Sequence, residues 1–163
     1  MSDAPPPVLD MARVIAYAIV DESVHWTGKQ KLFVGDKELG PVPKLALCQN
    51  VNGDMTDILI FHCNDDWKVI GISGGKKLDN AKISAERAYR GITAKWISAN
   101  VTEEEARAWI KENYPEMSCS FCERLACNLQ QLIESKSGVR VCNYCIDELY
   151  ALIHKPAGDD DVA

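Results

Sequence analysis

The segment CSFCERLACNLQQLIESKSGVRVCNYC, residues 119–145, decides the fold of the last quarter of the chain. It begins and ends with a Cys-x2-Cys pair, and a fifth cysteine, Cys127, lies between the two pairs. Cysteines in such patterns act as disulfide partners, as redox pairs or as metal ligands. The rest of the sequence helps to distinguish among these three roles.

The sequence favours a reducing environment. No apolar run approaches the roughly 20 residues of a membrane span, and the start MSDAPPPVLD lacks the basic and apolar regions of a secretory signal. We therefore expect a cytoplasmic protein, in which thiols are kept reduced. The chain has seven cysteines, so a complete disulfide framework would leave one of them unpaired. Both points favour metal binding or simple burial over disulfides.

The spacing Cys-x2-Cys-x19-Cys-x2-Cys is typical of a zinc site. Zinc takes four ligands at tetrahedral corners, with each sulfur about 2.3 Å away, and the tight turn of one knuckle offers two sulfurs at a suitable separation. Two knuckles complete the set, which favours one structural Zn²⁺ ion over a redox or buried role. Four thiolates leave no position for water or substrate, so we expect no catalysis by this ion. We interpret Cys127 as a spectator, with a competing ligand or a reactive thiol as alternatives.

The residues around the knuckles predict the local fold. A hairpin or short helix is expected between the knuckles, where the apolar residues are Leu125, Leu129, Leu132 and Ile133. The sequence IDELYALI after Cys145 predicts a helix with four residues facing inward, namely Ile146, Leu149, Leu152 and Ile153. A knuckle, a hairpin and a second knuckle that opens a helix describe a treble-clef zinc finger.

Residues 119–153 resemble the four-cysteine zinc-binding domain at the N-terminus of ClpX, the substrate-unfolding ATPase of a bacterial protease. The CSFC knuckle, the LI before the turn, the V-x-V-C-x2-C approach and the ID…LI helix correspond. In that family the domain dimerises and recognises adaptor proteins and some substrates. Two positions depart from the family, because Glu123 replaces the usual glycine and ESKSG replaces a glycine-proline turn. The resemblance implies that the zinc ligands are Cys119, Cys122, Cys142 and Cys145.

The region before the finger predicts an α+β domain over residues 8–114, an antiparallel sheet with covering helices. The zinc-binding domain is expected over residues 115–155. We expect residues 1–7 to be a flexible proline-rich lead-in and residues 156–163 to be a disordered acidic tail.

The first element of this domain has two interpretations. The apolar residues of its first part follow a three-and-four spacing, at Val8, Met11, Ile15, Ala18 and Ile19. This spacing favours an amphipathic helix that runs to about Glu22. The β-branched residues of RVIAYAIV keep a strand as the alternative.

The following elements have clearer boundaries. KLFVGDKELG predicts a hairpin with Gly35-Asp36 at its turn, and KLALCQN, DILIFHC and WKVIGIS predict an antiparallel meander. We expect Gly74 and Gly75 to end the last strand, and a helix capped by Asp79 or Asn80 to run through Arg90. A second helix is predicted by the capping box of Thr102 and Glu105.

The N-terminal domain offers weaker candidates for function. His62, Cys63, Asp65 and Asp66 suggest a second metal site, but alternation places His62 and Cys63 on opposite faces of a strand, so a turn is favoured for residues 64–66. His25 has no partner in sequence. GISGGKK does not match a phosphate loop, and a solvated hinge is preferred. We expect Cys48 and Cys63 to be buried and most of the four tryptophans to pack in the core.

No set of nucleophile, base and oxyanion donors emerges, so we expect a non-enzymatic protein-interaction module. Two forms are open: an adaptor or regulator linked to bacterial proteolysis, and an immunity-type inhibitor that binds a toxin. We expect partner proteins, with a homodimer through the finger as one arrangement. The alternative is a nucleic-acid-binding regulator, which the net charge of −6 and the lack of a basic stripe disfavour. An enzyme centred on His25, His62 or the 65–66 acid pair is the least favoured class.

Overall fold

The computed structural model describes residues 3–51, 57–126 and 129–155. The chain divides into two compact units, Met1–Glu112 and Asn113–Ala163, which we call the N-terminal unit and the C-terminal unit. Residues 1–2 of the predicted lead-in, Cys127 and the predicted acidic tail lie outside the described residues. Among the described residues, no helix has the length and apolar character needed to cross a membrane.

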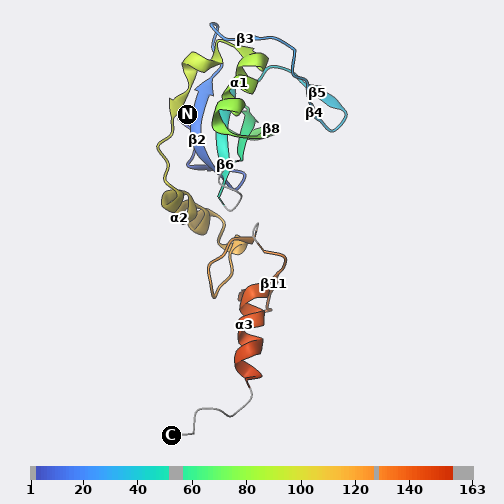
Figure 1. Ribbon diagram of the computed structural model, residues 1–163, viewed down its shortest axis with the longest axis vertical. Coiled ribbons are helices and arrows are strands. Elements are labelled where there is room, and N and C mark those ends of the chain that lie inside the picture. Colours follow the sequence, from blue (N-terminus) through green and yellow to red (C-terminus); the bar gives the residue numbers. More distant parts are fainter. Residues whose placement is uncertain (1–2, 52–56, 127–128, 156–163) are drawn as a thin grey trace. The chain divides into compact units, whose positions relative to one another are not determined.

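The N-terminal unit combines helices with an antiparallel sheet (Figure 1). The sheet runs in the order β1-β2-β6-β7-β8, and β10 pairs with β2. Its strands are β1 Val8–Leu9, β2 Ala12–Ile19, β6 Lys44–Asn50, β7 Ile58–Cys63, β8 Val69–Lys76 and β10 Ile97–Ser98. The predicted meander of three neighbouring strands, β6, β7 and β8, is confirmed.

The helix predicted from Val8 to about Glu22 is wrong, because these residues form the hairpin β1-β2. Asp10 and Met11 make its two-residue turn with φ angles of 41° and 63°, which a right-handed helix does not allow. Buried and half-buried residues then alternate along β2, as expected for a strand whose successive side chains point to opposite faces of the sheet. Strand β2 pairs with β6 at seven positions. This pairing stabilises the strand, although the apolar residues have the spacing of a helix.

Strand β2 contains a bulge, and its buried side chains therefore lie on both faces of the sheet. The register with β6 shifts between Val14 and Ala16. Val14 packs in one core with Cys48, whereas Ala16 packs in the other core with Leu47. Both faces of the sheet are therefore buried, and the predicted burial of Cys48 and Cys63 is confirmed.

Helix α1, Leu78–Ala88, lies against the sheet (Figure 1) and contributes side chains to one of these cores. Its buried residues are Ala81, Ala85 and Ala88. The helix begins one residue before Asp79, and Lys77 is its N-cap without a side-chain hydrogen bond, so the predicted Asp79 or Asn80 cap is wrong. It ends at Ala88, because Tyr89 and Arg90 form β9 (Tyr89–Arg90), which pairs with β3 (His25–Trp26).

The predicted hinge at GISGGKK is also wrong, because β8 continues through both glycines to Lys76. Gly74 has a φ of 126°, and a Cβ there would lie 2.7 Å from the carbonyl oxygen of Ile58. The register of β7 and β8 shifts between Ile58 and Leu59, so this glycine permits a bulge instead of a chain reversal.

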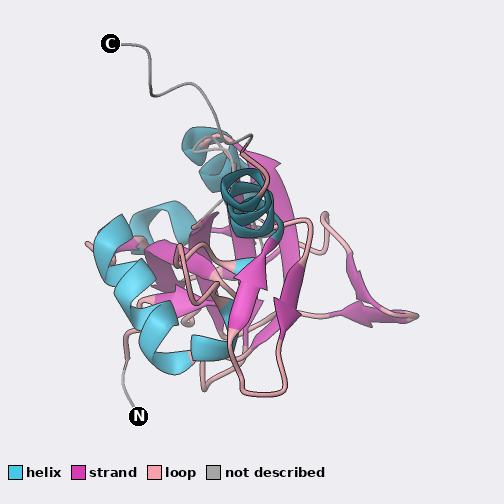
Figure 2. Cartoon of the chain, turned by 90° about the horizontal axis from the view of Figure 1, so that it is seen from below, coloured by secondary structure: helices cyan, strands magenta, loops and turns pink. Residues whose placement is uncertain are grey.

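Two further predicted elements of the N-terminal unit are confirmed. The hairpin β4-β5, Leu32–Val34 with Lys37–Leu39, extends away from the sheet (Figures 1 and 2). Helix α2, Glu103–Asn113, starts at the predicted capping box, where the Thr102 N–H donates to the Glu105 carboxylate at 2.8 Å. The Glu105 N–H donates in return to the Thr102 hydroxyl at 3.1 Å. A short 3-10 helix, Ile92–Lys95, lies between β9 and β10.

The C-terminal unit contains a 3-10 turn, a hairpin and a helix. Their bounds are Pro115–Met117, β11 Leu132–Glu134, β12 Arg140–Cys142 and α3 Asn143–Ile153. The element between the knuckles is thus a hairpin. The predicted helix after Cys145 is present, but its apolar residues do not face inward: Leu152 is 66 % and Ile153 76 % exposed. A unit of this size has too little other structure to cover them.

Candidate metal centre

Three short elements bring the four knuckle cysteines together. Cys119 and Cys122 lie in the loop that follows the 3-10 turn, Cys142 ends β12, and Cys145 lies in the first turn of α3. Cys119, Cys142 and Cys145 are buried, whereas Cys122 is half-buried. All four sulfurs lie within 4.8 Å of one another.

The sulfur separations fit one tetrahedral zinc ion. A Zn–S distance of about 2.3 Å places tetrahedral sulfurs about 3.8 Å apart. The Cys119 and Cys145 sulfurs are 3.8 Å apart, and those of Cys122 and Cys142 are 3.6 Å apart. A disulfide would require about 2 Å, so these are free thiols at metal-binding separation. When bound, the ion joins the two knuckles and fixes the hairpin against α3.

The second knuckle is also the start of a helix. Cys142 is the N-cap of α3, and its sulfur accepts a hydrogen bond from the Cys145 N–H at 3.5 Å. Hydrogen bonding at the cap and metal binding therefore use the same sulfur.

The Cys119 thiol of the first knuckle ionises at a lower pH than an ordinary cysteine. Burial opposes the charged form of Cys119, but backbone N–H donors at Cys122, Phe121 and Cys142 outweigh it and lower its pKa to about 6. Burial and the neighbouring sulfurs raise the pKa of Cys145. A divalent cation offsets this repulsion, since zinc binds cysteine as thiolate.

Comparison with known proteins agrees with this geometry. The family model described as the ClpX C4-type zinc finger matches residues 117–155. The C-terminal unit contains a ClpX-type zinc finger. Its four cysteines form a site for one zinc ion. Searches of curated proteins and of solved structures returned no match to the chain.

The ClpX-type finger departs from its family at a strained position. Glu123 follows the first knuckle and has a φ of 59°, in the left-handed region that glycine adopts without cost. Its N–H donates to the Cys119 carbonyl oxygen at 3.0 Å, which closes the knuckle turn. The turn therefore forms with glutamate, although its backbone conformation favours the glycine usual in the family.

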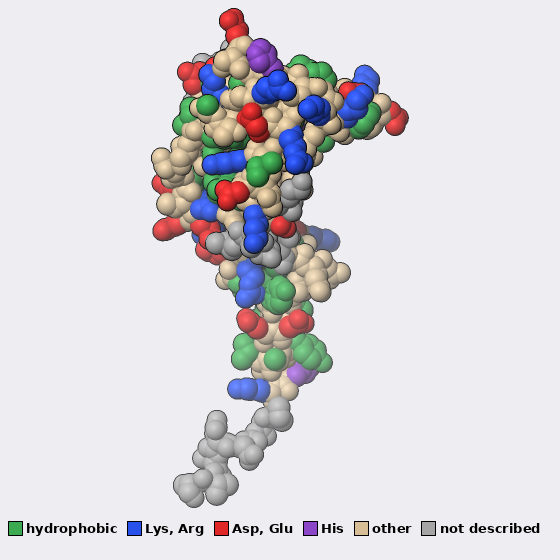
Figure 3. Space-filling view, turned by 45° about the horizontal axis from the view of Figure 1, so that its top comes forward, with side chains coloured by type: hydrophobic (Ala, Val, Ile, Leu, Met, Phe, Trp, Pro, Cys, Tyr) green, Lys and Arg blue, Asp and Glu red, His purple; other side chains and the backbone are tan. Residues whose placement is uncertain are grey.

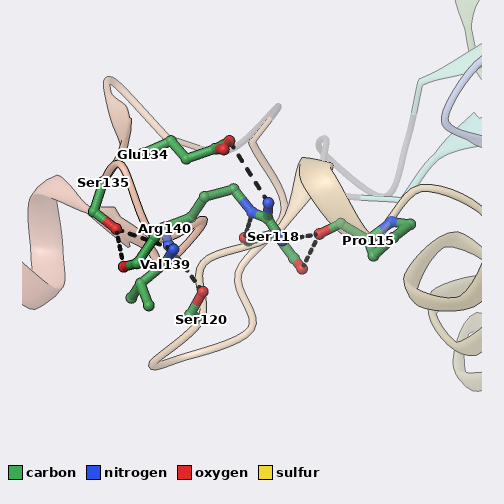
Figure 4. Close-up of polar contacts among 8 residues, drawn as sticks. Pro115, Ser118, Ser120, Glu134, Ser135, Val139 and Arg140 are labelled. Atoms are coloured by element: carbon green, nitrogen blue, oxygen red, sulfur yellow. Dashed lines mark hydrogen bonds and ion pairs between the residues drawn. The ribbon is translucent and has the colours of Figure 1, made fainter.

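Arg140 ties the hairpin of the finger to its first knuckle (Figure 4). Its guanidinium donates to the carbonyl oxygens of Pro115 at 2.9 Å and Ser118 at 3.2 Å, and lies 3.6 Å from the Glu134 carboxylate. Its backbone N–H donates to the Ser120 hydroxyl at 2.9 Å, and the Ser120 N–H donates to the Arg140 carbonyl oxygen at 2.8 Å. These bonds hold the two ligand-bearing segments in place around the metal site.

The ESKSG turn is closed by the backbone and the hydroxyl of Ser135, and the Ser135 N–H donates to the Val139 carbonyl oxygen at 2.8 Å. The Ser135 hydroxyl accepts from the Val139 N–H at 3.1 Å and lies 2.8 Å from the Ser137 hydroxyl, as drawn in part in Figure 4. Gly138, with a φ of 82°, supplies the left-handed residue. The departure from the family turn thus leaves the strand pairing up to the ligand Cys142 intact.

The weaker sequence candidates are separated in the structure. His62 Nε2 lies 3.0 Å from the Ser73 hydroxyl, whereas Cys63 is buried in the core that holds Trp67. The turn role of residues 64–66 is confirmed, since the Asn64 side-chain oxygen accepts from the backbone N–H groups of Asp66 and Lys68. Within the described ranges, the knuckle cysteines are the only group suited to hold a metal ion.

Sequence reasoning missed Arg140 and Ser120. An arginine before a knuckle has no distinctive spacing, and its contacts depend on the register of the hairpin with the first knuckle. The tryptophans, most of which were expected to pack in the core, divide into three groups: Trp67 is buried and Trp96 packs against a core, Trp109 is half-buried, and Trp26 is 36 % exposed and lines a cavity of the N-terminal unit.

Proposed function

We propose that the protein is a non-enzymatic, zinc-binding interaction module that acts as an adaptor or regulator in bacterial proteolysis and dimerises through its finger. The observation that carries this proposal is an apolar groove on the finger, between the hairpin and α3. Its volume is about 470 Å³, and we call it the α3 groove. It is lined by Phe121, Ile133, Ser135, Val139, Val141, Ile146, Leu149, Tyr150 and Ile153.

The α3 groove presents apolar side chains that the finger itself does not cover. Phe121 is 59 %, Tyr150 64 % and Ile153 76 % exposed. Figure 3 shows hydrophobic side chains gathered at the surface of the C-terminal unit, near the end of its described part. A contiguous exposed apolar surface on so small a unit indicates an interaction site.

We assign this surface to a second copy of the same finger. The described residues of the lining include no charged one, so the surface that they form is not complementary to nucleic acid or to a charged segment. An identical apolar surface on another copy is complementary in polarity, and a two-fold pair buries both at once. Zinc fingers of the ClpX type are known to mediate dimerisation and protein interaction in general, which supports this assignment.

Two structural parts of the proposal go with it. The order of first knuckle, hairpin and second knuckle at the start of α3 supports a treble-clef arrangement for the finger. The four-sulfur site supports a structural role for zinc, because a closed coordination sphere holds no water or substrate. The N-terminal unit would then contact the partner specific to this protein, and the paired fingers would present two such units.

The dimer is tested by measuring mass in solution by light scattering for three proteins. We expect wild type to be dimeric, Leu149→Asp to be monomeric because its charge enters the α3 groove, and Leu152→Asp to remain dimeric. Leu152 is a matched control, since it is an exposed leucine of the same helix outside the groove lining. Zinc content near one ion per chain in all three would show that the finger is folded. A monomeric wild type, or equal loss in both variants, would contradict the proposal.

The role in proteolysis is tested by affinity capture from the native cell. We expect a subunit or substrate of a proteolytic complex to be retained by wild type. Retention of a single basic toxin instead would favour the immunity-type function. Tight, sequence-dependent binding of a labelled duplex would favour the nucleic-acid alternative. Capture with Leu149→Asp then distinguishes partners that require the paired finger from partners of the N-terminal unit.

A further inference from the structure

The N-terminal unit contains a cavity of about 300 Å³ that is separate from the finger. Its floor is formed by β7 and β8, one side by α1, and the other side by the segment that leads into and out of the β4-β5 hairpin. It is lined by Trp26, Gln30, Lys31, Leu32, Leu39, Gly40, His62, Ser73, Gly74, Ser84, Ala88 and Tyr89. This size lies at the lower end of the range for small-molecule sites.

Specific contacts hold the walls of this cavity. Gly71 of β8 leaves room for the hairpin, because a Cβ there would lie 2.6 Å from the Leu32 side chain and 3.0 Å from that of Leu39. The hairpin base thus packs directly on the sheet. Gln30 joins the opposite wall, since its side-chain amide donates to the Ser84 hydroxyl of α1 at 2.8 Å. The cavity is therefore built by packing and hydrogen bonding on two sides.

The floor carries one polar pair. His62 is 8 % exposed, and its Nε2 lies 3.0 Å from the Ser73 hydroxyl oxygen. A hydroxyl oxygen has one proton and two lone pairs, so either imidazole tautomer leaves Ser73 able to accept one more hydrogen bond. A ligand that carries an N–H or O–H group is the complement of this position.

The charge of the cavity is balanced. Burial lowers the pKa of His62 to about 4, so the imidazole is neutral at pH 7. Such a weak base is poorly matched to activating a serine at that pH, which favours binding over nucleophilic catalysis. Among the described residues of the lining, Lys31 is the only charged one, and its ammonium pairs with Glu38 at 2.9 Å. A cationic ligand would find no anionic partner among the described lining residues, and an anionic ligand would have to compete with Glu38 for Lys31.

The rest of the lining combines apolar and aromatic side chains with polar ones, Gln30 and Ser84 among them. Aromatic rings and branched side chains surround the polar floor, and they come from Trp26, Leu32, Leu39 and Tyr89. Tyr89 is fixed in place, because its hydroxyl accepts a hydrogen bond from the Val42 N–H at 3.1 Å. Apolar walls with a few placed polar groups are the usual composition of a small-molecule site.

We propose that this cavity binds a small neutral cyclic molecule, with its ring between Trp26 and the hairpin leucines and an N–H or O–H group donating to Ser73. The site would give the N-terminal unit a ligand-binding function that does not depend on the finger or on dimerisation.

The proposal is tested by titrating the full protein with four probes while the His62 ring and Trp26 indole resonances are followed by NMR. Benzamide is neutral and has an N–H donor, N,N-dimethylbenzamide lacks the donor, and benzoate and benzylammonium carry opposite charges. We expect benzamide alone to shift both resonances, with a dissociation constant on the order of 1 mM, as befits so small a ligand. Stronger binding of either charged probe, or no shift with benzamide, would overturn the proposal.

Two variants locate the site. Ser73→Ala removes the acceptor and should weaken benzamide binding about 5-fold to 10-fold. Trp26→Ala removes a partly exposed ring and should weaken binding without loss of folding. Ser137→Ala, in the hairpin turn of the finger, serves as the control and should bind as wild type does. Unchanged binding in both Ser73→Ala and Trp26→Ala would place the probe elsewhere and overturn the proposal.

Discussion

Single residues decide how the two knuckles are shaped. The ligands of the finger follow from spacing, because each Cys-x2-Cys turn is local and directs both of its sulfurs inward. The spacing of the cysteines does not predict the backbone conformation of the residue that follows the knuckle. Glu123 has a left-handed backbone there, and glycine suits the position because it adopts this conformation without cost. The glutamate at this position should therefore lower the stability of the finger relative to glycine, and this difference can be measured.

Glu123→Gly should therefore stabilise the finger by about 0.5–1 kcal/mol, because glycine adopts a positive φ without the Cβ penalty. The stability of the C-terminal unit is measured by zinc-dependent urea unfolding, followed by the NMR resonances of α3. Glu148→Gly is the matched control, since this exposed glutamate lies inside α3 and should lose about 0.5–1 kcal/mol when replaced by glycine. Destabilisation by both substitutions would contradict the strain at position 123.

At the scale of elements, local chemistry predicted more than periodicity did. The capping box, the hairpin turn at Gly35-Asp36 and the meander were predictable because each depends on neighbouring residues. The apolar spacing from Val8 to Ile19 led to the wrong prediction of a helix. A bulged strand with buried side chains on both faces of the sheet also places apolar residues at uneven intervals. The contacts of Arg140 and the pairing of His62 with Ser73 depend on register between segments, which no local pattern specifies.

The capping box of α2 gives a direct test of such local chemistry. Thr102→Ala should destabilise α2 by about 1 kcal/mol, because the Glu105 N–H loses its acceptor at the helix start. Hydrogen exchange at the amides of the first turn should become about 5-fold faster. Thr102→Ser keeps the hydroxyl and should leave exchange near the wild-type rate. Equal acceleration in both variants would mean that the hydroxyl bond does not stabilise the helix.

At the scale of the whole molecule, the two units are stabilised by different physics. The N-terminal unit has a buried core on each face of its sheet, and none of the residues in these cores comes from the finger. The core of the finger is centred on the ligand cysteines Cys119, Cys142 and Cys145, while its remaining apolar surface is largely exposed. In a unit this small, metal binding free energy is folding free energy.

Zinc removal should therefore unfold one unit and spare the other. With excess chelator we expect the resonances of α3 to collapse to unfolded positions, while the thermal midpoint of the N-terminal unit stays within about 2 °C of its value with zinc. Cys142→Ser should reproduce this result without chelator, because it removes a zinc ligand while the serine hydroxyl can still cap α3. Cys127→Ser is the matched control and should keep one zinc per chain, as expected for a spectator cysteine. A single unfolding transition that moves with zinc for the entire chain would contradict this independence, and would mean that the ion stabilises the sheet as well as the finger.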